Sequence, residues 1–236
     1  MVLLIALLII LLGAASWLGY RQMFRLELLN QNLVINGFLI AMGVLTLMTI
    51  AHWIGVFPQS VAARVTMGVY TFAAGFFFGY GVRLLNMRKE AGDIEYIYRS
   101  FWTDIAPNLI AIFLVAYGIY RTGVLTLGPF TGIGITSGLS LVGFGFWGWT
   151  VHVVPEFRKE GLLMLDQFVP WKQVLAYKWR SEESLQIDYL TQNKKLSEFV
   201  TYIPPEDQLL LERILGGKIS EYEEERKQAM QELDNE

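Results

Sequence analysis

Long apolar runs occupy the first two thirds of the chain, and shorter runs with alternating polar residues occupy the rest. A helix that crosses a membrane needs about 20 mostly apolar residues. Five segments approach that length, namely Val2–Leu18, Leu33–Val56, Val61–Leu85, Ile105–Leu127 and Phe130–Val154. The pattern therefore predicts an α-helical polytopic membrane domain over residues 1–154, with about five transmembrane helices.

The distribution of Lys and Arg predicts the orientation of these helices. No basic residue precedes the first apolar run, while Arg21 and Arg25 follow it, so an uncleaved anchor with its N-terminus outside fits better than a cleaved signal peptide. In that orientation most basic residues lie on the cytoplasmic side, and only Arg64 and Arg121 lie outside. Five spans then place the C-terminus in the cytoplasm. We expect a multi-pass protein of a bacterial inner (cytoplasmic) membrane.

Glycines recur at helix-packing intervals within the predicted membrane domain. Small residues four positions apart let transmembrane helices approach each other closely. Pairs with this spacing are Gly75 and Gly79, Gly128 and Gly132, and Gly134 and Gly138. We interpret them as packing positions within this chain, and the alternative is a face that docks another subunit. The last predicted span has so many glycines that we expect close neighbours on more than one side.

The loop from Arg88 to Asn108 is the densest polar cluster of the predicted membrane domain. At helical spacing, one face of this loop is apolar and would suit a helix that lies along the cytoplasmic interface. Arg99 and Trp102 are then expected to contact lipid headgroups or a partner. The residues of the apolar face are Ile94, Ile97, Tyr98, Phe101 and Ile105.

After Pro155 the pattern changes to that of a small α+β module over residues 155–218, followed by an acidic helical tail over 219–236. Short apolar runs between polar turns predict antiparallel strands. About four strands are expected, over Gly161–Leu165, Val174–Trp179, Leu185–Leu190 and Leu196–Ile203. One helix is predicted over Asp207–Leu215, with Gly216 and Gly217 as its C-terminal cap.

The run "VPWKQVLAYKW", the glycine at 161, two hairpins with polar turns and the closing helix carry a resemblance. The segment resembles a small bacterial domain family of unknown function that follows transmembrane helices and looks related to pleckstrin-homology-like modules. The resemblance implies a platform for binding or assembly. Four strands are fewer than a full pleckstrin-homology pattern has. Trp171 and Trp179 are expected to be core residues, with contact to a partner as the alternative.

Composition excludes several classes of function. The formal net charge of −3 and the lack of a basic patch exclude a general nucleic-acid binder. The chain has no cysteine, and the predicted span interiors hold no Asp, Glu or Lys, which argues against a proton-coupled transporter. No cofactor or metal is predicted. His52 and His152 would lie on opposite membrane faces, about 30 Å apart, although a single histidine could still bind a pigment or a metal.

These observations predict a non-enzymatic integral membrane subunit or scaffold of a bacterial membrane complex. Its expected partners are membrane lipids, other membrane subunits or a second copy of itself, and a cytoplasmic protein held by the C-terminal module. One alternative is a small transporter or channel gated by that module, with Thr136, Ser137 and Ser140 lining a path. Another is an enzyme acting at the membrane interface through the carboxylates of the polar loop, Asp93, Glu95 and Asp104.

Overall fold

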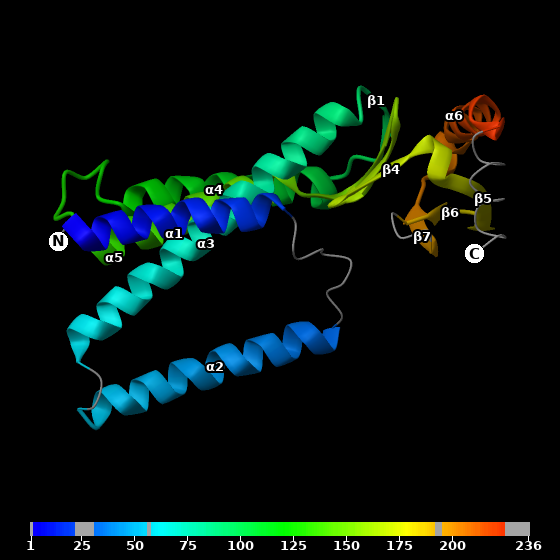
Figure 1. The fold of residues 1–236 in the computed structure, drawn as a ribbon. Helices are drawn as coiled ribbons and strands as arrows, with labels where there is room; N and C mark the ends of the chain where they lie inside the picture. Colours follow the sequence, from blue (N-terminus) through cyan, green and yellow to red (C-terminus); the bar gives the residue numbers. More distant parts are fainter. Residues whose placement is uncertain (1, 22–30, 56–57, 192–194, 225–236) are drawn as a thin grey trace. The chain divides into compact units, whose positions relative to one another are not determined.

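The computed structural model describes residues 2–21, 31–55, 58–191 and 195–224 (Figure 1). The chain divides into two compact units. The first, which we call the helical unit, comprises residues 1–85 and 105–151, and the second, the sheet unit, comprises residues 86–104 and 152–236. The chain therefore passes between the units three times, and the sheet unit is assembled from two separate stretches of sequence.

The helical unit is built from five helices, the third of which continues into the sheet unit. They are α1 (Val2–Tyr20), α2 (Gln31–Trp53), α3 (Gln59–Glu90), α4 (Ala106–Arg121) and α5 (Gly132–Thr150). Within the described residues, three helices are long and apolar enough to cross a membrane. These are Val2–Tyr20, Gln59–Glu90 and Phe101–Arg121, the last being α4 with the π-helical turn (Phe101–Ile105) that precedes it.

Five transmembrane helices were predicted, and the second and fifth are not among these three. In α2 the apolar stretch of described residues is the short segment Ile35–Val44. Helix α5 has the length of a span and no charged residue, but six of its 19 residues are glycine, which adds almost no hydropathy. The fifth span was also expected to reach Val154, whereas a strand already begins at His152.

Helices α4 and α5 form an antiparallel hairpin with very close backbones. A Cβ atom added to Gly138 would lie 2.5 Å from the carbonyl oxygen of Gly118, and one added to Gly145 would lie 2.8 Å from the carbonyl oxygen of Ala111. The opposite side of α5 meets α3, because a Cβ atom at Gly143 would lie 2.7 Å from the carbonyl oxygen of Ala74. The expectation that this segment has close neighbours on more than one side is confirmed.

The other predicted packing glycines fall into two groups. Gly75 and Gly79 lie on α3 directly against the backbone of α1, where no Cβ atom would fit. Gly132 lies against the side chain of Met67, and Gly134 lies beside Thr131, the residue that caps its own helix. Gly128 lies in the connection between α4 and α5, where its nearest neighbour is Thr126, so it packs no pair of helices.

The sheet unit contains two antiparallel sheets and a C-terminal helix, α6 (Gln208–Glu221). In each sheet, strands that follow one another in sequence are also neighbours in space. The four-stranded sheet contains β1 (Ile94–Ile97), β2 (His152–Arg158), β3 (Gly161–Leu165) and β4 (Gln167–Pro170). The three-stranded sheet contains β5 (Val174–Ser181), β6 (Ser184–Leu190) and β7 (Leu196–Tyr202).

The described residues thus contain seven strands, where four were predicted. The four predicted strands correspond to β3, β5, β6 and β7. The prediction of a helical apolar face in the loop after α3 was wrong over residues 94–97, because this segment is β1 and pairs with β2. Strand β2 was missed because its apolar start extends the run of α5, and Pro155 lies where the register with β3 shifts, a position that tolerates proline.

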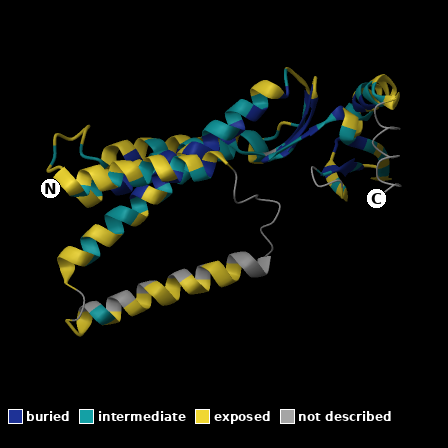
Figure 2. Ribbon diagram, in the orientation of Figure 1, coloured by how far each residue is buried: buried dark blue, intermediate teal, exposed yellow. Residues whose placement is uncertain are grey.

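One hydrophobic core joins both sheets and α6. Fully buried side chains come from the four-stranded sheet (Phe157, Leu162), from the three-stranded sheet (Leu185, Ile187) and from α6 (Leu211 and Leu215). Figure 2 shows dark blue, buried stretches along the strands of the sheet unit. Because β1 contributes Tyr96 to this core, the loop between α3 and α4 is part of the folded module.

Helix α6 extends beyond its predicted end. Gly216 and Gly217 do not cap it, because the helix continues to Glu221. A Cβ atom at either glycine would meet nothing within 4 Å. Packing against the described part of the chain therefore gives no reason for two consecutive glycines. Glycines weaken a helix interior because they lose the most backbone freedom on folding.

We predict that Gly216→Ala raises the free energy of unfolding of the sheet unit by about 0.5–1 kcal/mol, because alanine restricts the unfolded chain and meets no steric obstacle. Gly161→Ala is the matched control. Its Cβ atom would lie 2.8 Å from the Phe168 ring and from Pro170 Cα, so it should lower stability. Denaturant unfolding of the full chain in detergent tests both changes, and a loss of stability in Gly216→Ala would contradict this account of α6.

Candidate functional site

The most deeply buried charged residue of the sheet unit is Glu156 on β2, whose side chain is 1% exposed. Its Oε2 atom accepts a hydrogen bond of 2.6 Å from Nε of Arg158 and lies 2.5 Å from Nη2 of the same side chain. Both arginine nitrogens thus converge on one carboxylate oxygen, and hydrogen bonds between two charged groups are stronger than those between neutral groups. The Oε1 atom lies 3.7 Å from Nη2 of Arg88, at the end of α3. Two guanidinium groups therefore surround one buried carboxylate.

Arg158 also connects three segments of backbone. Its Nη1 atom donates to the carbonyl oxygens of Arg88, at 3.2 Å, and Gly92, at 2.6 Å. The Arg158 carbonyl oxygen in turn accepts a 2.9 Å bond from Nε1 of Trp171. The end of α3, the turn before β1 and the short 3₁₀ turn between β4 and β5 (Trp171–Gln173) are thus all bonded to β2. We call Arg88, His152, Glu156 and Arg158 the ionic cluster.

His152 completes the ionic cluster. Its Nδ1 atom lies 2.8 Å from Oε1 of Glu156 and also contacts Nη2 of Arg88. One ring nitrogen cannot accept a hydrogen bond from Arg88 and donate one to Glu156 at the same time. If Nδ1 carries a proton, it donates a hydrogen bond to the Glu156 carboxylate. If the ring is neutral with its proton on Nε2, Nδ1 accepts a hydrogen bond from the Arg88 guanidinium. The histidine that the sequence left open as a pigment or metal ligand is therefore engaged with an ion pair, and the His52 side chain lies outside the described part of the chain.

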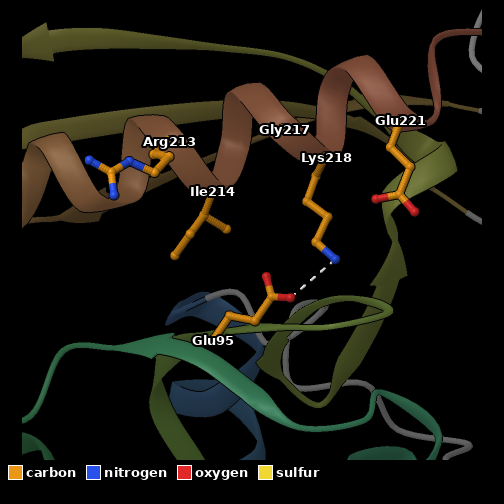
Figure 3. Close-up of a pocket in the computed structure, with 6 residues that line it drawn as sticks. All are labelled: Glu95, Arg213, Ile214, Gly217, Lys218 and Glu221. Atoms are coloured by element: carbon orange, nitrogen blue, oxygen red, sulfur yellow. Dashed lines mark ion pairs between the residues drawn. The ribbon is translucent and has the colours of Figure 1, made fainter.

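A second feature is an open groove of about 530 Å³ between α6 and β1 (Figure 3). The Lys218 side chain reaches across it, and its Nζ atom lies 3.1 Å from Oε1 of Glu95 and 2.9 Å from the carbonyl oxygen of Lys159. Arg213 and Glu221 lie at the two ends of the groove, with Gly217 between them. We call this feature the α6 groove. It carries both signs of charge and has one wall position without a side chain.

The start of α6 is tied to β1 by a buried tyrosine. The hydroxyl of Tyr96, a residue that is 7% exposed, donates a 2.8 Å hydrogen bond to Oδ2 of Asp207. Burial, together with this bond to a carboxylate, raises the pKa of the Tyr96 phenol above its ordinary value of 10.0. The neutral phenol is thus favoured in the folded protein.

The four residues predicted to contact a partner have different surroundings. Arg99 is exposed, and Trp102 is 79% exposed beside the ring of Phe101, so both are available for contact. Trp171 is 2% exposed, which removes it as a surface contact and makes it a core residue, the other expectation. Trp179 packs partly against the core, and its Nε1 atom donates 2.8 Å to Oε1 of Glu212 on α6.

Residues proposed for the alternative functions have local partners. Thr136 and Ser137 of α5 are buried, and their hydroxyls donate to backbone carbonyls of the same helix, at 2.8 Å to Gly132 and 3.1 Å to Gly134. Glu95 forms its ion pair with Lys218. Across the described residues, no group of three or more His, Cys, Asp or Glu side chains is placed to hold a metal ion.

The ionic cluster yields a first prediction. Glu156→Gln should lower the free energy of unfolding by about 3 kcal/mol, because it leaves buried guanidinium groups without their counter-charge. Glu95→Gln is the control, since it removes an acid from a pair with a more exposed carboxylate and should cost less than about 1 kcal/mol. Thermal or denaturant unfolding of both variants measures the difference, and equal losses would show that the cluster does not hold the unit together.

Tyr96 yields a second prediction, about pH. Its folded-state pKa is raised above the unfolded value, so its contribution to stability is fully present below about pH 10 and is lost as the pH rises toward the folded-state pKa. Stability of the sheet unit should therefore decline above about pH 10. Tyr96→Phe should be less stable at neutral pH and should show a smaller alkaline decline. The free energy of unfolding of both proteins, measured at a series of pH values across this range, tests the prediction. An equal alkaline decline in the two proteins would rule out the assignment to Tyr96.

Comparison with known proteins gives one match, over the sheet unit. Residues 154–220 match a family described as a domain of unknown function (DUF5673). This range begins within β2 and ends one residue before the end of α6, and it excludes β1. No curated protein and no solved structure matches the chain. The C-terminal part of the chain is thus similar to a domain whose description names no activity.

Proposed function

We propose that this protein is a non-enzymatic subunit or scaffold of a bacterial membrane complex, with a cytoplasmic module that holds a protein partner. The observation that carries the proposal is the ionic cluster. Its buried carboxylate, Glu156, is neutralised by two arginines of the same unit, and those arginines are in turn bonded to backbone carbonyls. The strongest electrostatic interactions of the module thus serve its own assembly, and none is directed at a substrate.

The arrangement of the sheet unit supports an attached platform. Two antiparallel sheets of four and three strands, followed by a helix, agree with the pleckstrin-homology-like resemblance better than the four predicted strands did. Helix α3 has 32 residues, so it is about 48 Å long, whereas the apolar core of a membrane is about 30 Å thick. Its final turns, with Arg88 and Lys89, therefore extend beyond the lipid and enter the module.

Exposed side chains at the start of the candidate span Phe101–Arg121 support contact with the membrane surface. Trp102 and Phe101 are 79% and 53% exposed, and Arg99 precedes them. Tryptophan and arginine are favoured at the level of lipid headgroups. We rank a gated transporter or channel second, because the hydroxyls of Thr136 and Ser137 are used within their own helix.

Purification from the native membrane in mild detergent tests the proposal. We expect the full chain to retain protein companions, or a second copy of itself, at a fixed ratio through size-exclusion chromatography. Mass spectrometry of the same sample identifies them, and an absorption spectrum reports any pigment. Elution as a monomer without companions would contradict the proposal and would make solute flux in liposomes the next assay.

A further inference from the structure

We propose that a second copy of this chain docks in the α6 groove, with the two α6 helices antiparallel across a two-fold axis at Gly217. The inference rests on the proposed function, because it names one partner of the module. It starts from the order of three residues on α6, Arg213, Gly217 and Glu221.

These three residues are spaced four apart, so they follow one ridge of the helix surface. Arg213 and Glu221 are exposed, and neither forms an ion pair with another described residue. At a rise of 1.5 Å per residue, they lie about 6 Å on either side of Gly217 along the helix axis. A positive and a negative charge thus stand at equal distances from a position without a side chain.

This order is complementary to itself. In a two-fold interface a residue that contacts a second residue is contacted by that second residue in return. If the axis passes through Gly217, Arg213 of each copy faces Glu221 of the other, and two equivalent ion pairs form. A parallel arrangement would place like charges together. The charges therefore favour an antiparallel pair of identical helices.

The glycines provide the space for such a crossing. A Cβ atom at Gly216 or Gly217 would meet no described residue within 4 Å, and Gly217 forms part of the wall of the α6 groove (Figure 3). Ridges spaced four residues apart pack into each other at a crossing angle of about −50°. The exposed side chain of Leu210, on the same side of α6 and 47% exposed, adds apolar surface.

The absence of cysteine from the chain makes a sharp test possible, because Gly217→Cys introduces the only thiol. Helix axes 8–10 Å apart place facing Cα atoms roughly 3.4–5.4 Å from each other, since each Cα lies about 2.3 Å from its axis. The upper half of this range, from about 4.4 Å, permits a disulfide. We expect copper phenanthroline to cross-link the full-length variant in detergent into a dimer. Lys172→Cys, an exposed position away from α6, is the matched control and should stay monomeric.

Charge reversal then tests the pairing. In the Gly217→Cys chain, Arg213→Glu should reduce cross-linking by roughly tenfold, because the two-fold axis applies each change twice. Adding Glu221→Arg should restore it, since the exchanged charges again match. Both positions are exposed, and a thermal melt of each variant confirms folding.

Two results would overturn the inference. One is cross-linking of Gly217→Cys no greater than that of the Lys172→Cys control, and the other is a double charge exchange that fails to restore dimers lost on Arg213→Glu. If either occurs while the chain still retains other proteins on purification, the proposed scaffold function stands and this interface fails. If dimers form as expected but no other protein is retained, the interface stands, and the scaffold is confined to copies of this chain.

Discussion

A carboxylate that is 1% exposed can remain charged only where opposite charges are held around it, and Glu156 imposes this requirement on the sheet unit. The charges that meet it come from different segments. Arg158 lies two residues along the same strand, while Arg88 ends a helix almost 70 residues earlier. Because removal of one member of a buried ion pair is far more costly than its net contribution, the end of α3, the turn before β1 and strand β2 must assemble together.

This constraint explains why β1 belongs to the module although it lies between two helices of the other unit. The Arg158 guanidinium bonds the carbonyl oxygens of Arg88 and Gly92, and these bonds place the following residues beside β2, where Tyr96 enters the core. Tyr96 then bonds Asp207 at the start of α6. The hydrogen bonds of Arg158 and the buried side chain of Tyr96 thus link β2, through β1, to the start of α6. The match to a known domain family begins at residue 154 and does not include β1.

Local patterns predicted the elements whose signals are local. Strands β3, β5, β6 and β7 were found because short apolar runs alternate with polar turns. Strand β1 was missed because its residues also fit a helical apolar face, and its pairing with β2 is not visible in either segment alone. The ionic cluster could not be predicted for the same reason, since Arg158 and Arg88 are 70 positions apart. The signal that was available is local: the opposite charges of Glu156 and Arg158 stand two positions apart, directly after an apolar run that was predicted to end at Val154.

Glycines have different structural roles in the two units. In α4 and α5, Gly118 and Gly138 allow two backbones of this chain to touch, so the structure itself accounts for them. In α6, Gly216 and Gly217 weaken the helix, and none of the described residues comes within 4 Å of a Cβ atom placed at either one. A residue that contradicts its local structure without a compensating internal contact is expected mainly at functional positions. We therefore attribute the two glycines of α6 to contact with a molecule outside the monomer. The opposite charges on either side of Gly217 favour a second copy related by a two-fold axis.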